Sequence, residues 1–158
     1  MAGDANVADE RTADHLALRD VALTYATACD RRDPDLFVSA FLPDARLRVY
    51  RPSDAPAPEG DHNGHDALRK IPAMLGVYTR TYHFVGNASY DIGDDVATGE
   101  VYCMAHHLTA ARHGGTNFVM YIRYQDVYRR DPAGAWKIAD RRVLIDWTDT
   151  RTADPSAR

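Results

Sequence analysis

The spacing of apolar residues along the chain changes near residue 80. Before it, apolar positions recur every three or four residues, which is the period of an amphipathic α-helix. The clearest such pattern ends near Asp30, and Asp33 followed by Pro34 supplies the N-cap carboxylate and first-turn proline of another helix. The helical patterns cover residues 14–30, 34–42 and 66–78. We therefore expect about three N-terminal helices, with one alternating strand over residues 46–50.

From Tyr82 onward the pattern becomes that of strands. Apolar, β-branched and aromatic residues form four runs, over residues 81–87, 96–111, 116–130 and 135–147. Short turn-forming segments join them, at residues 93–95, 113–115 and 131–134. Such short links favour antiparallel neighbours. The expected class is α+β, in which a curved antiparallel sheet is packed by the N-terminal helices and encloses a pocket.

Composition places the chain among globular single-domain proteins. We expect one domain over residues 14–148, between a disordered leader (1–13) and a polar C-terminal tail (149–158). The 158 residues are 45% hydrophobic and 27% charged. A net charge of −4 argues against nucleic-acid binding, and no apolar run is long enough to span a membrane. The polar start lacks a signal core, and Cys29 and Cys103 are expected to be free buried thiols, so we expect a cytoplasmic protein.

One histidine stands out because of its setting. His83 lies within the run Thr81-Tyr82-His83-Phe84-Val85-Gly86, which predicts a strand buried on at least one face. A buried imidazole is costly unless a partner takes a ring N–H. A core histidine satisfied by the backbone is the plain alternative to a functional one.

The sequence offers little support for metal or nucleotide chemistry. His62 and His65 share a glycine-containing loop, but no carboxylate–histidine helix motif accompanies them. A glycine-rich phosphate loop and a Gly-x-Ser-x-Gly elbow are both lacking in the sequence. We therefore expect neither a metal nor a cofactor.

Several segments together resemble a known family. The run at residues 81–86 is the most specific, and the others are Cys-Asp-Arg-Arg-Asp at 29–33, Leu-Arg-Val-Tyr at 47–50 and Trp-Lys-Ile at 136–138. The chain resembles the SnoaL-like members of the NTF2-like superfamily, a cone-shaped α+β fold, and within them the scytalone dehydratases. It also shares features with bile acid 7-alpha-dehydratases and hexachlorocyclohexane dehydrochlorinases. The resemblance covers roughly residues 14–147.

The resemblance implies a set of catalytic residues. Asp30 and His83 match the family's carboxylate–histidine pair, Tyr50 matches a tyrosine that helps bind the substrate carbonyl, and His106 matches a second pocket histidine. Substrate-contacting positions of the implied pocket are Tyr25, Cys29, Tyr102, Met104, Ile122, Tyr124 and Arg141. Of these, Cys29, Ile122 and Tyr124 replace the tyrosine, serine and asparagine of the family pattern.

Strand parity leaves two of these positions open. Adjacent strand residues face opposite ways, so either His106 or His107 faces the pocket, and the same holds for Arg141 and Arg142. Both faces of the strand at 96–111 are partly apolar, so the residues alone do not decide. The resemblance favours His106.

The function that the resemblance implies is a cofactor-independent lyase. It would remove water from a cyclic, ketone-bearing small molecule of polyketide or steroid type, with His83 as base and acid. The alternatives are an isomerase or polyketide cyclase with the same dyad, and a non-catalytic ligand binder or ring-hydroxylating oxygenase β subunit. A homo-oligomer, trimer or dimer, is expected to cover the apolar outer face of the sheet.

Overall fold

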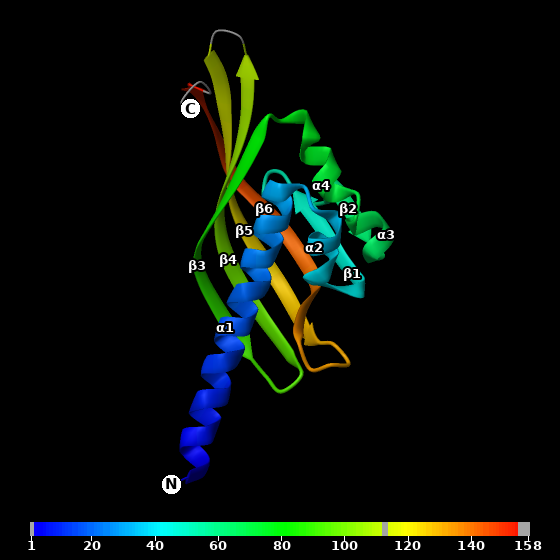
Figure 1. Cartoon of the computed structure of the whole chain (residues 1–158), viewed down its shortest axis with the longest axis vertical. Coiled ribbons are helices and arrows are strands. Elements are labelled where there is room, and N and C mark those ends of the chain that lie inside the picture. Colours follow the sequence, from blue (N-terminus) through cyan, green and yellow to red (C-terminus); the bar gives the residue numbers. More distant parts are fainter. Residues whose placement is uncertain (1, 112–113, 155–158) are drawn as a thin grey trace.

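The computed structural model describes residues 2–111 and 114–154. Helices pack on one face of a long curved sheet, and α1 crosses that face diagonally (Figure 1). The helical elements are α1 (Ala2–Arg31), α2 (Pro34–Ser39), α3 (Gly64–Leu68), α4 (Ile71–Met74) and the short 3-10 helix η1 (Leu75–Val77). The strands are β1 (Phe41–Tyr50), β2 (Gly60–Asn63), β3 (Arg80–Ile92), β4 (Val96–Ala111), β5 (Gly114–Arg130) and β6 (Trp136–Ala153).

Over the described residues, the strands form one six-stranded sheet in the order β2-β1-β6-β5-β4-β3. All neighbours are antiparallel except β1 and β6, which run parallel. The expected α+β class and curved sheet are confirmed. The single parallel pair arises because the helices and the long hairpins β3 to β6 intervene between β1 and its neighbour.

The start of α2 follows the signals in its sequence. Asp33 Oδ1 accepts hydrogen bonds from the backbone N–H groups of Asp35 and Leu36, at 3.0 and 2.9 Å, and Pro34 takes the first helical position. Arg32 has a φ of 54°, which ends α1 and turns the chain. This junction fixes the direction of the last turn of α1, where Asp30 lies.

Several boundaries differ from those expected. Helix α1 extends back to Ala2, where a disordered leader was predicted, because residues 2–13 are mostly helix-compatible and lack proline. Strand β6 continues to Ala153, through the start of the predicted tail. The predicted helix over residues 66–78 is divided into α3, α4 and η1, and Pro72 lies in the first turn of α4. Residues 1, 112–113 and 155–158 lie outside the described part, and with them parts of the predicted leader, of the predicted turn at residues 113–115 and of the predicted tail.

The hydrophobic core lies between the helices and the inner face of the sheet. It includes Leu18 and Ala22 of α1, Phe37 of α2, Leu47 of β1 and Ile138 of β6, all almost fully buried. This packing holds α1 against β3, so the end of α1 meets the first half of β3. Among the described residues, none of the helices combines the length and hydropathy of a membrane span.

Candidate active site

Asp30 and His83 are joined by two hydrogen bonds. The ring nitrogen Nδ1 of His83 lies 2.7 Å from Asp30 Oδ1, and the backbone N–H of His83 donates to Asp30 Oδ2 at 2.9 Å. Both carboxylate oxygens thus hold the same residue, one through its backbone and one through its ring. The carboxylate comes from the last turn of α1 and the histidine from β3. The hydrogen bond that we expected between the two side chains is present.

The electrostatics of the pair favour an ionised aspartate. Burial pulls the pKa of Asp30 upward, but the hydrogen bonds from the ring and backbone of His83 outweigh it and lower that pKa below its ordinary value. Since an ionised carboxylate only accepts hydrogen bonds, the proton between the two groups sits on His83 Nδ1. In the neutral ring, Nε2 is then an unprotonated acceptor. The side chain of His83 is 6% exposed, so this acceptor is sheltered from bulk water.

His83 lines an apolar cavity of about 250 Å³. The cavity lies between the sheet and the segments that cover it, and most of its wall is aliphatic. Its polar lining residues are Tyr25, Arg51, His62, His83, His107 and Tyr124. Its apolar lining residues are Leu47, Val49, Ile71, Met74, Leu75, Ala105, Met120, Ile122, Val143 and Ile145. Tyr25, Ile122 and Tyr124 therefore face the cavity as predicted.

The second histidine of the cavity is His107, and the expectation of His106 was wrong. The ring centroids of His107 and His83 are 5.9 Å apart, and His107 also packs against Tyr78 at 4.6 Å. Its Nδ1 lies 3.3 Å from the carbonyl oxygen of Phe118. Burial, and next the nearby His83, lower the pKa of His107 from 6.5 to about 4. His107 is therefore a neutral imidazole at physiological pH.

His106 lies on the opposite, outer face of the sheet. Its Nδ1 is 2.9 Å from the side-chain amide of Asn117, and Tyr82 packs edge-on against its ring. Tyr102 and Met104 share this face, at 44% and 37% exposure, and do not line the cavity as predicted. The inner face of β4 instead presents residues of the core and cavity, which are Val101, Cys103, Ala105 and His107.

Tyr50 also faces away from the cavity. Leu47 and Val49 line it, and Tyr50 has the opposite parity on β1. The guanidinium of Arg142 lies over the Tyr50 ring, 4.9 Å from its centroid. The predicted contact of Tyr50 with a substrate carbonyl in this cavity therefore has no support in the structure.

Arg141 lies behind the cavity wall. It is fully buried and makes a two-point ion pair with Asp126, with distances of 2.8 and 2.7 Å. Its guanidinium packs against the rings of Tyr25 and Tyr124, 4.2 and 4.3 Å from their centroids, and the two rings also contact each other edge-on at 5.4 Å. Arg141 therefore fixes two rings of the cavity wall rather than lining it, which corrects its predicted contact with substrate.

The tyrosines and cysteines around Arg141 are neutral. Burial is the main cause that raises the pKa of Tyr25 and Tyr124 well above 10, so both phenols keep their protons. Burial likewise raises the pKa of Cys29 to about 12. Cys29 is 2% exposed and packs in the core, so it does not contact the cavity as predicted. It is a free thiol, as expected.

Of the polar cavity residues, Arg51 and His62 were not predicted to line the cavity, and His107 was the less favoured of two alternatives. Arg51 and His62 flank a proline-rich stretch in which apolar and polar residues show no clear pattern, whereas His107 could have been found from the buried alternation at 101, 103 and 105.

Within residues 2–111 and 114–154, the structure shows no group of three or more His, Cys, Asp and Glu side chains that could hold a metal ion.

Comparison with known proteins agrees with this fold. The model of the SnoaL-like domain family matches residues 10–142, which is most of the chain. The chain belongs to the SnoaL-like family. No curated protein sequence matches it.

Several solved structures share the fold of this SnoaL-like protein. A candidate scytalone dehydratase from Novosphingobium aromaticivorans has a TM-score of 0.75 at 21% identity, covering 96% of this chain and 98% of its own. A type-3 hexachlorocyclohexane dehydrochlorinase from Novosphingobium barchaimii has a TM-score of 0.72 at 17% identity, with 89% and 92% covered. A Mycobacterium tuberculosis protein of unknown function scores 0.73 at 23% identity, with 88% and 75% covered. Another structure from Novosphingobium aromaticivorans is described as an NTF2-like protein with a cystatin-like fold.

Proposed function

We propose that this protein is a cofactor-independent lyase that dehydrates a cyclic, ketone-bearing small molecule. The observation that carries the proposal is the attachment of His83 to an ionised Asp30 through both its ring and its backbone, at the wall of an apolar cavity. A buried carboxylate on one ring nitrogen fixes the tautomer and stabilises the imidazolium that forms when the other nitrogen takes a proton. That is the requirement for a single histidine to act first as base and then as acid.

In the proposed reaction the same proton is transferred twice, first from the substrate to His83 and then from His83 to the leaving hydroxyl. Nε2 of His83 removes the proton from the carbon next to the ketone, and the electron pair moves toward the carbonyl oxygen as an enolate. The enolate then re-forms the ketone and expels the β-hydroxyl, which leaves as water after taking the proton back from Nε2. The products are the unsaturated ketone and one water, and His83 returns to its neutral state. General acid–base catalysis of this kind contributes about 10²–10⁴ in rate.

Neutral donors in the wall complete the site. Tyr25 and Tyr124 keep their phenolic protons and are the O–H groups best suited to the developing enolate oxygen. His107 faces the same cavity as a neutral ring, so it can hydrogen-bond the leaving hydroxyl without competing for the proton that His83 carries. These roles replace those expected for Tyr50 and His106.

The volume of the cavity limits the size of the substrate that it can hold. Its volume of about 250 Å³ is slightly below the range of roughly 300–1,000 Å³ that is usual for small-molecule sites. This favours one or two fused rings, as in aromatic polyketides, over a four-ring steroid. The structural likeness to a candidate scytalone dehydratase and to a dehydrochlorinase supports elimination as the reaction class.

An isomerase or polyketide cyclase is the second candidate. The closeness of two cavity histidines favours it, since His83 and His107, with ring centroids 5.9 Å apart, could move a proton between two carbons without losing a leaving group. The mass of the product distinguishes the reactions, because a dehydratase product is lighter by one water whereas an isomerase product keeps the substrate's mass. A non-catalytic ligand binder would require no dyad at all.

Metabolite profiling tests the proposal and identifies the substrate. Extracts are incubated with the wild-type protein, with His83→Ala and with His106→Ala, and consumed compounds are identified by mass spectrometry. We expect the wild type and His106→Ala to consume a compound and form its dehydrated product, and His83→Ala to leave it intact. Equal consumption by His83→Ala would contradict the proposal.

A further inference from the structure

In the described part of the chain, the cavity lining contains basic side chains and no acidic ones. Within the described part of the chain, its wall carries Arg51 and three histidines but no carboxylate, because Asp30 stands behind His83. We propose that Arg51 binds an anionic group of the substrate, so that the site takes small ring compounds bearing a carboxylate. This inference rests on the proposed function for the identity of the reacting site, but the binding it predicts can be measured without turnover.

The position of Arg51 follows from strand parity. Leu47 and Val49 point into the cavity from β1, and Arg51 continues the same every-second-residue pattern just beyond the strand. The sheet order places β6, β5 and β4 between β1 and β3, which carries His83. Arg51 and His83 therefore approach the cavity from different walls, with the apolar side chains of the intervening strands between them. A ring compound can rest on those side chains while its two ends meet the two polar groups.

The guanidinium of Arg51 has N–H groups that can donate hydrogen bonds to a ligand. Its Nε lies 3.2 Å from Glu59 Oε2, and the side chain of Glu59 is 57% exposed. Its Nη2 lies 3.9 Å from the thioether of Met120, which lines the cavity. A thioether is a weak acceptor. Among the described residues, this thioether is the acceptor that meets the guanidinium on its cavity side. A carboxylate would offer two oxygens in the matching geometry.

Arg141, in the same fold, is not available to bind an anionic ligand. Its charge is balanced by the buried Asp126, and its guanidinium packs against the rings of Tyr25 and Tyr124. The guanidinium of Arg51 is covered less closely, with its Cζ 6.0 Å from the centroid of the Phe118 ring. Its acidic partner Glu59 is largely exposed, so the ion pair can rearrange around a ligand at small cost. Arg51 is therefore the arginine that can recognise an anion here.

A matched pair of ligands tests the inference. Naphthoate and its neutral isostere naphthamide differ in charge but little in shape, and both have the two fused rings that suit the cavity. Their dissociation constants are measured by calorimetry at low ionic strength for the wild type, Arg51→Gln and Arg46→Gln. Arg46 is a fitting control because it pairs with Asp61 at 2.8 Å and does not line the cavity.

We expect the wild type and Arg46→Gln to bind naphthoate about five- to tenfold more tightly than naphthamide, with the preference shrinking as salt screens the pair. In Arg51→Gln the two ligands should bind with equal affinity, close to that of naphthamide for the wild type. Equal affinities in the wild type, a preference that survives Arg51→Gln, or failure to bind either ligand would overturn the inference. His83→Ala should keep the preference, so a failed catalytic proposal and a failed anion site give different results.

Discussion

The buried, neutral His107 should make the protein less stable in mild acid. It is 3% exposed, and burial followed by the neighbouring His83 lowers its pKa from 6.5 to about 4. Between these two values the unfolded chain binds a proton that the folded chain does not. Stability therefore rises with pH across this window and is lost as the pH falls from about 6.5 toward 4. Replacement by glutamine, which does not ionise but can donate to the Phe118 carbonyl, removes this contribution.

The magnitude follows from the pKa difference. One pKa unit corresponds to about 1.4 kcal/mol, so His107 alone would lower the free energy of unfolding by about 2 kcal/mol between pH 7.5 and pH 5. Water in the adjoining cavity screens part of this effect, and we expect about 1–2 kcal/mol. The variant His107→Gln should lose that much less stability than the wild type over the same interval.

Urea denaturation at both pH values, followed by circular dichroism, measures the difference. The control is His15→Gln, since His15 lies exposed on α1 and contributes no comparable burial. If the wild type and His107→Gln lose equal stability on going from pH 7.5 to pH 5, the reasoning from burial is refuted. A direct titration by NMR that finds His107 protonated at pH 6 would refute it as well.

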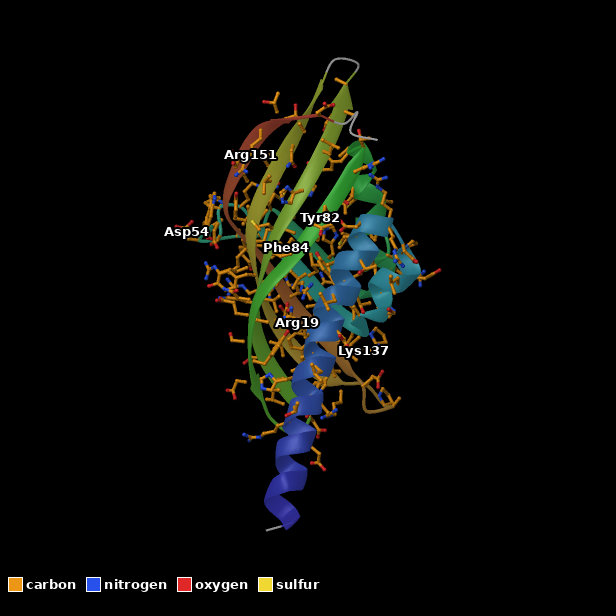
Figure 2. The ribbon with its side chains drawn as sticks, turned by 60° about the vertical axis from the view of Figure 1, so that its left-hand side comes forward. Arg19, Asp54, Tyr82, Phe84, Lys137 and Arg151 are labelled. Carbon is orange, nitrogen blue, oxygen red and sulfur yellow. The ribbon has the colours of Figure 1, made fainter. Side chains whose placement is uncertain are left out.

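The remaining predictions concern the buried ion pair and the outer face of the sheet. Asp126→Asn leaves the guanidinium of Arg141 buried without its counter-charge, and should destabilise the fold by about 3–5 kcal/mol in thermal or urea unfolding; a loss below 1 kcal/mol would contradict the assigned burial. The outer face exposes a stacked Tyr121–Trp147 pair, and Figure 2 shows Tyr82 and Phe84 close together along β3. We expect this face to be covered in a trimer or dimer. Light scattering should show an oligomer that Trp147→Lys weakens, and a wild-type monomer at micromolar concentration would refute it.

Periodicity was sufficient to predict the main elements of the fold. The N-cap at Asp33 with Pro34, and the alternation after Tyr82, act within a few residues and do not depend on distant contacts. The helical leader and the extension of β6 were missed for a different reason. Their polar sequences give no periodic signal, and the strand is held by its register with β5, where Thr150 pairs with Phe118.

The site was predictable only in part. The pairing of Asp30 with His83 was expected because a buried strand histidine needs a partner and the resemblance supplied one. Tyr50 and His106 were placed by matched positions alone, and each is on the wrong face of its strand. A shift of one residue reverses the direction of a strand side chain, so a resemblance that is correct for the fold can assign the neighbouring residue. Arg51 continues the alternation of Leu47 and Val49 into the cavity, but it lies one residue beyond the predicted strand, where the sequence does not show that the alternation persists.

The most direct test of the account is the turnover of dyad variants on the substrate that profiling identifies. We predict that His83→Ala and Asp30→Asn each lower kcat/KM by about 10²–10⁴. The double variant should be little worse than the more impaired single variant, because the two residues act as one unit. Circular dichroism should show that the variants stay folded, and His106→Ala should keep near wild-type turnover. Near-normal turnover in His83→Ala, or losses in the two single variants that multiply in the double variant, would contradict the claim that Asp30 and His83 form the catalytic unit.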